Sequence, residues 1–203
     1  MTIHYASPPE SSRQIARTGL ERLAKFAQEA RAVDLMALQA DNLELSVPHT
    51  MHTVQLDDLV ARRPLGETAV TGWRYLASRG SRVLASSELS AGTDGQPIAL
   101  EQVNMGPYVE STAQALAGLS ENDEIRAGDY EFRILRIPAL CAVVLWLSPA
   151  DSGTNLFVPL APAPDYLEAD RIYRENEMLD ALEGPARLRL EFDDSRNEPY
   201  GEG

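Results

Sequence analysis

Cysteine, lysine and long apolar runs are scarce in this sequence, and each scarcity narrows what the protein can be. Cys141 is the one cysteine, so an intrachain disulfide is impossible and an oxidising compartment is not indicated. The longest apolar run, Ile137 to Leu147, is about half of the ~20 residues that a membrane-spanning helix needs. The first residues lack the basic and apolar regions of a secretion signal. We therefore expect a soluble, cytoplasmic protein without a membrane partner.

Basic charge is also scarce, because 18 basic residues, of which only Lys25 is a lysine, stand against 31 acidic ones. The preference for arginine is typical of GC-rich bacterial genomes. A net charge of −13 repels phosphate groups, so nucleic acid is not an expected partner. The acids gather from Asp165 onward, where 12 acids and 5 arginines give −7, whereas the first 33 residues carry 5 bases and 3 acids. The two ends of the chain can therefore attract each other, within one chain or between copies.

The spacing of apolar residues predicts the secondary structure of the first half of the chain. Apolar residues three and four apart predict a helix from about residue 11 to Gln39. Period-two alternation then predicts an antiparallel meander of three strands over residues 71–103. Pro107 suits the first position of a central helix, because its missing N–H would have no partner there.

The second half of the chain is predicted to hold further strands and a last helix. Residues 139–147 are apolar on both faces, which is typical of a central strand covered from both sides. A helix that begins between Asp165 and Glu175 is expected to end at Gly184-Pro185. A short strand at 188–192 would follow it.

This order of elements predicts an α+β fold, with a largely antiparallel sheet packed by an N-terminal, a central and a C-terminal helix. We find no repeat and no linker rich in Pro, Gly or Ser that would divide the chain. We therefore expect a flexible arm at 1–10, a single domain over 11–192 and a flexible acidic tail at 193–203.

His49 and His52 form the densest histidine signal and are the candidates for metal ligands. The neighbouring Val47, Pro48 and Val54 favour extended structure, in which positions i and i+3 point to opposite faces. Zinc also needs three or four ligands. We expect no metal or other cofactor, and two partly exposed histidines in a loop or an edge strand.

The motifs of enzymes are incomplete in this sequence. Cys141 lies in the most apolar stretch and is expected to be a small buried thiol rather than a nucleophile. The sequence holds neither a Gly-x-Ser-x-Gly elbow nor a glycine-rich phosphate loop. The sequence therefore favours a protein that is not an enzyme.

The segment from Asn104 to Tyr108 joins a predicted strand to the central helix. A helix N-terminus attracts anions because its first amides point outward, although Pro107 removes one of them. The candidates for ligand binding are therefore Asn104, Gly106 and Tyr108, with Arg74, Arg133 or Arg136 as contacts for an anion.

Three functions stay open from the sequence. The first is an interaction or assembly component with a protein partner or a second copy, because an amphipathic helix, the extended segment 157–164 and the acidic tail can each dock on a protein. The second is a small enzyme or ligand-binding domain with an anion site at Asn104–Tyr108. The third is an immunity or inhibitor protein whose negative charge steers it to a basic partner.

Overall fold

The computed structural model describes residues 2–4, 8–29, 43–119, 121–126, 128–150 and 153–195. It confirms the α+β class and the three expected helices, N-terminal, central and C-terminal. The helices are α1 (Glu10–Glu29), α2 (Leu56–Val60), α3 (Pro107–Leu119), α4 (Asp123–Arg126) and α5 (Glu175–Ser195). Among the described residues, no helix is both long and apolar enough to cross a bilayer.

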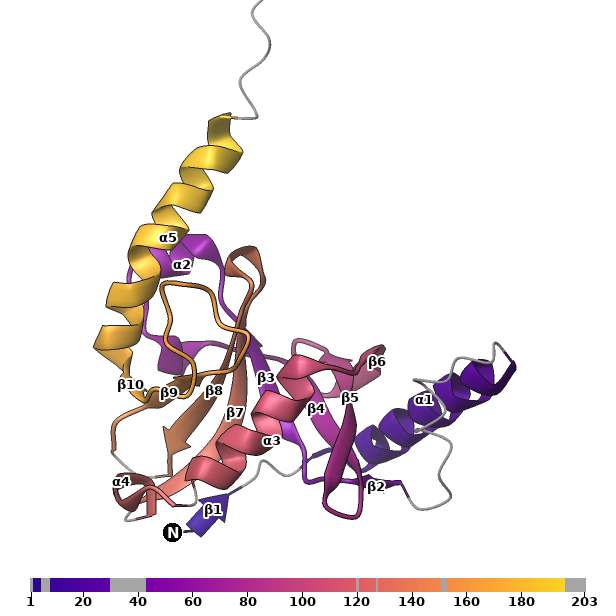
Figure 1. Cartoon of the computed structure of the whole chain (residues 1–203). Helices are drawn as coiled ribbons and strands as arrows, with labels where there is room; N and C mark the ends of the chain where they lie inside the picture. Colours follow the sequence, from indigo (N-terminus) through magenta and orange to yellow (C-terminus); the bar gives the residue numbers. More distant parts are fainter. Residues whose placement is uncertain are drawn as a thin grey trace, which may run out of the picture.

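The described residues form one sheet of ten strands, to which the helices attach (Figure 1). In sequence order the strands are β1 (Thr2–His4), β2 (Glu44–Leu45), β3 (His49–Thr53), β4 (Val70–Arg79), β5 (Arg82–Ala91), β6 (Pro97–Asn104), β7 (Asp129–Ile137), β8 (Ala142–Pro149), β9 (Leu156–Pro159) and β10 (Tyr173–Arg174). The main path is β10-β9-β8-β7-β3-β4-β5-β6. Its pairs are antiparallel except for β3 with β7, and β1 also joins β7 in parallel.

The two faces of the sheet carry different helices. Trp73 of β4, Thr50 of β3, Arg133 of β7 and Trp146 of β8 are register partners in turn, so their side chains share one face. At one end of this face α1 packs over β4 to β6, and at the other end α5 and α2 pack over β7 to β9. We call it the α1/α5 face. The opposite face, the α3 face, is covered by α3, which packs over Met51 and its neighbours.

The C-terminal helix differs from its prediction. The expected end at Gly184-Pro185 and the expected strand at 188–192 are both wrong, because α5 continues through Pro185 to Ser195. Proline removes one main-chain hydrogen bond inside a helix. Leu182 and Ala186, on either side of it, are fully buried against the core, and this packing offsets the loss.

The expected domain boundaries, an arm at 1–10, a domain over 11–192 and a tail at 193–203, stay predictions. Thr2–His4 pair with β7, while the end of the expected acidic tail, residues 196–203, lies outside the described residues. The expected extension of the first helix to Gln39 also lies outside them.

Candidate functional site: a cavity at the start of α3

A cavity of about 250 Å³ lies on the α3 face, where β6 turns into α3. We call it the α3 cavity. Charged and amide side chains from the sheet line one part of it, and apolar side chains line the rest. The lining residues are Arg74, Glu88, Gln102, Asn104, Met105, Pro107, Tyr108, Val109, Ile134, Arg136 and Val143.

Strand register brings the polar lining together. Arg74 of β4 is the register partner of Glu88 of β5, and Glu88 is the partner of Gln102 of β6. Because register partners project from the same face, these three side chains form a row across three strands. Arg136 reaches the same row from β7, beyond β3 in the sheet order.

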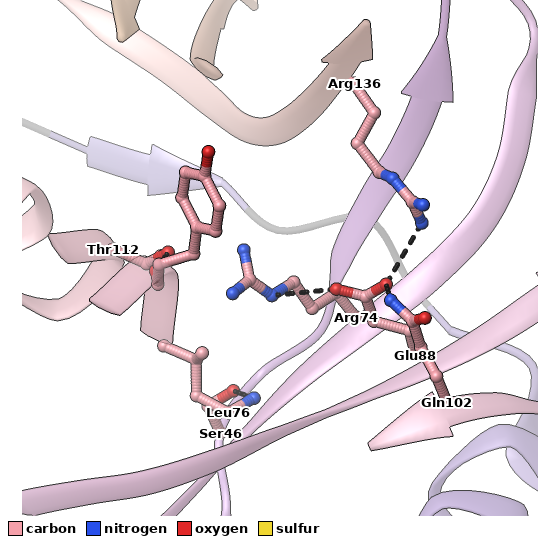
Figure 2. Close-up of polar contacts among 8 residues, drawn as sticks. Ser46, Arg74, Leu76, Glu88, Gln102, Thr112 and Arg136 are labelled. Carbon is pink, nitrogen blue, oxygen red and sulfur yellow. Dashed lines mark hydrogen bonds and ion pairs between the residues drawn. The ribbon is translucent and has the colours of Figure 1, made fainter. Parts of the chain in front are cut away.

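Two guanidinium groups share the carboxylate of Glu88 (Figure 2). Arg136 Nη1 donates to Glu88 Oε2 at 3.0 Å, and Gln102 Nε2 donates to the same oxygen at 2.8 Å. Arg74 Nε lies 3.5 Å from Glu88 Oε1. We call Arg74, Glu88 and Arg136 the charge triad. With two positive groups and one negative group ionised, the triad carries a net charge of +1.

Arg74 is the most buried member of the triad, with 2 % of its side chain exposed. Its Nε makes no hydrogen bond within the described part of the chain. Burial lowers the pKa of Arg74, Glu88 raises it, and the charge of Arg136 lowers it again. Arginine nevertheless stays protonated. Figure 2 shows its two terminal nitrogens on the side away from the Glu88 carboxylate, toward α3.

The start of α3 offers few amides to a ligand. Pro107 has no N–H, and the N–H groups of Val109 and Glu110 donate to the Gly106 carbonyl at 3.0 and 3.3 Å. Gly106 has φ of +116°, a conformation that glycine adopts readily, and this permits the sharp turn from β6 into the helix. An anion in the α3 cavity would therefore meet guanidinium groups rather than a cradle of main-chain amides.

The structure brings some of the sequence-predicted ligand residues together and separates others. Asn104, Tyr108 and Arg136 line the α3 cavity, and so does Arg74. Arg133 lies on the α1/α5 face, with its guanidinium 4.6 Å from the Trp146 ring centre and its Nε 2.7 Å from Glu131 Oε1.

Glu88 and Gln102 are two polar lining residues that the sequence did not predict as ligand contacts. Their neighbouring positions in a predicted hairpin could have indicated a cross-strand pair. The hairpin, however, is bulged beside Glu88. A bulge shifts which residues face each other, and alternation alone does not reveal it.

His49 and His52 lie on opposite faces of β3, as the extended reading expected. Their expected exposure is wrong, because β3 lies between β4 and β7 and the two residues are only 1 % and 3 % exposed. Burial is the main cause that lowers the pKa of each histidine to about 4. Within the described ranges, no group of three or more His, Cys, Asp or Glu side chains could hold a metal.

Cys141 is exposed, so its expected burial is wrong. The apolar run is broken by the turn η3 (Pro138–Leu140), and Cys141 follows it with φ of +52° before β8 begins. The Cys141 carbonyl accepts a hydrogen bond from the Tyr108 hydroxyl at 3.2 Å. The turn between β7 and β8 therefore contacts a residue of the α3 cavity.

Comparison of the chain with protein-family models, with curated proteins and with solved structures finds no match. The α3 cavity is therefore the feature of the chain that points to a function. Its groups are two guanidiniums, one carboxylate that both of them contact, two amides and a phenol. Such groups recognise charge and hold a ligand in one orientation.

Proposed function

We propose that this protein binds a small molecule with an anionic group in the α3 cavity. The observation that carries the proposal is the buried guanidinium of Arg74, which shares Glu88, its counterion within the described residues, with Arg136. A buried charge without full compensation is strongly unfavourable. An anionic ligand would supply the missing negative charge and use the terminal nitrogens that point away from Glu88.

The shape and lining of the α3 cavity support a binding role. Ligand sites are concave and mostly apolar, with a few polar groups that fix orientation, and commonly enclose about 300–1,000 Å³. The α3 cavity has this mixture at about 250 Å³, so a small ligand fits it better than a nucleotide-sized one.

The test is a thermal-shift screen with small carboxylates, phosphates and neutral analogues. At least one anionic compound should raise the Tm, since a ligand at 100 times its Kd stabilises by about 2.7 kcal/mol. Arg136→Gln should abolish the shift, because it removes the excess positive charge of the triad.

The chain offers a matched control for that screen. Arg133 lies on the same strand as Arg136, pairs with a glutamate and has similar exposure, 24 % against 26 %. Arg133→Gln should therefore keep the ligand-induced shift. If no anion shifts the Tm, or if the shift survives Arg136→Gln, the proposal fails.

A second candidate function, an interaction or assembly component, is favoured by the end of α5. In Figure 1 the last turns of α5 extend beyond the sheet. Leu188 and Phe192, one helical turn apart, are 68 % and 50 % exposed there. Light scattering after size exclusion should give a mass above one chain or a co-eluting protein partner, which Leu188→Glu with Phe192→Glu removes. A strict monomer that retains no partner on gel filtration of the native extract contradicts this function.

We propose a cytoplasmic location, since a reducing compartment keeps an exposed thiol such as that of Cys141 free. A test is thiol-reactive labelling of the native extract. Cys141 should be labelled without prior reduction, and a blocked thiol would contradict the assignment.

A further inference from the structure

The structure points to a ligand of one chemical class, and we infer that it is a monocarboxylate with a compact apolar tail. This inference rests on the proposed function and narrows it. Three observations carry it: the net charge of the triad, the planar donors of Arg74, and the apolar wall of the α3 cavity.

The charge of the triad selects a monoanion. Arg74 and Arg136 contribute two positive charges and Glu88 one negative charge, so a single negative charge balances the group. A phosphate monoester carries close to two negative charges at neutral pH. It would leave an excess negative charge beside Glu88, which is 6 % exposed and poorly screened by solvent.

The donors of the α3 cavity suit a planar carboxylate. The guanidinium of arginine presents a flat fork of N–H groups that matches a carboxylate, as it also matches a phosphate, with two parallel hydrogen bonds. Phosphate sites at helix N-termini depend instead on several main-chain amides. At the start of α3 one amide does not exist and two are donated to Gly106, so this second kind of site is not built here.

The apolar side chains that line the α3 cavity indicate that the rest of the ligand is apolar. Met105, Val109, Ile134 and Val143 line the α3 cavity together with the charged row. A ligand whose carboxylate meets Arg74 would lay an aliphatic or aromatic tail against these side chains. Each methylene buried there should lower Kd about fourfold, which corresponds to about 0.8 kcal/mol.

The test is calorimetric titration of the full chain with sodium acetate, butanoate and hexanoate, beside hexyl phosphate, inorganic phosphate and 1-hexanol. Affinity should rise from acetate to hexanoate by about fourfold for each added methylene. Hexanoate should bind at least tenfold more tightly than the alcohol, since loss of a charge-assisted pair is worth more than about 1.4 kcal/mol. It should also bind more tightly than both phosphates, because their additional negative charge is not balanced by the triad.

Three variants locate the binding. Arg136→Gln should weaken hexanoate at least tenfold, and it avoids the folding risk of replacing the buried Arg74. Arg133→Gln should leave Kd unchanged within about twofold. Met105→Gln, at a residue 36 % exposed, should reduce the gain per methylene without changing the affinity for acetate.

The outcomes separate the inference from the function on which it rests. Tighter binding of either phosphate than of hexanoate, lost in Arg136→Gln, overturns the monocarboxylate and leaves an anion site. Equal binding of hexanol and hexanoate overturns the role of charge and therefore both proposals. Binding of no compound, or binding that Arg136→Gln does not change, also overturns both.

Discussion

Arg133 and Arg136 lie three residues apart on β7 and project from opposite faces of the sheet. Both are about one quarter exposed and both pair with a glutamate. Arg133 has Glu131 as its counterion and stacks on Trp146, whereas Arg136 shares Glu88 with the buried Arg74. The α1/α5 face thus has a balanced pair at this place, and the α3 face has an excess positive charge beside a cavity. The balance of charge around an arginine, rather than its exposure, therefore distinguishes the two surroundings.

The largest change in the free energy of unfolding is expected on lowering the pH, because each face also holds a buried histidine. His49 on the α3 face and His52 on the α1/α5 face take up a proton near pH 6.5 in the unfolded chain but only near pH 4 when folded. The unfolded state then binds more protons in this window, so the free energy of unfolding falls as the pH falls from 6.5 to 4. The loss should be about 3 kcal/mol for each histidine.

Urea unfolding at a series of pH values measures how steeply the free energy of unfolding falls with pH. His49→Gln, on the α3 face, and His52→Gln, on the α1/α5 face, should each remove about half of this acid-induced loss in the free energy of unfolding. If both variants keep the slope of the unaltered protein, other groups cause it.

The next largest effect is expected from the two glutamates that pair with these arginines. Glu88→Gln leaves Arg74 buried without a counterion and should lower the free energy of unfolding by about 3–5 kcal/mol. Glu131→Gln opens a pair that is about one quarter exposed, so it should change the free energy by at most about 1 kcal/mol. Urea denaturation of both variants compares them, and equal losses would contradict the distinction between the faces.

The smallest effect on stability is expected from the arginines themselves. Arg136→Gln leaves Arg74 paired one to one with Glu88, and Arg133→Gln removes a partly exposed pair and a stacking contact. Each should change the free energy of unfolding by about 1 kcal/mol or less. Thermal melting would therefore not distinguish the two variants, while ligand binding would. A loss of more than about 3 kcal/mol in Arg136→Gln would show that the triad is a structural element.

Local signals in the sequence predicted the local parts of the fold. The meander over 71–103 and the start of α3 at Pro107 follow from alternation and turn residues that lie close in the chain. The predicted helix end at Gly184-Pro185 was wrong because packing of α5 against residues far along the chain outweighed this local signal. The predicted burial of Cys141 was wrong because a turn interrupts the apolar run.

The candidate site was predicted in the same uneven way. Asn104 and Tyr108 belong to one junction and could be named from it. Period-two alternation places Arg133 and Arg136 on opposite faces, but which face meets α3 depends on the order of the strands. The row formed by Arg74, Glu88 and Gln102 depends on register across three strands and on a bulge.

The parallel pairing of β3 with β7 has a consequence for the time course of folding. Arg74 and Glu88 belong to the antiparallel meander, whose contacts are local, whereas Arg136 and Val143 belong to the hairpin of β7 and β8. Thr50 pairs with Arg133, far along the chain, so joining the halves requires the closure of a long loop. We expect the α3 cavity to be assembled only at that late step. Ligand uptake during refolding would then mark the moment when the two halves of the sheet meet.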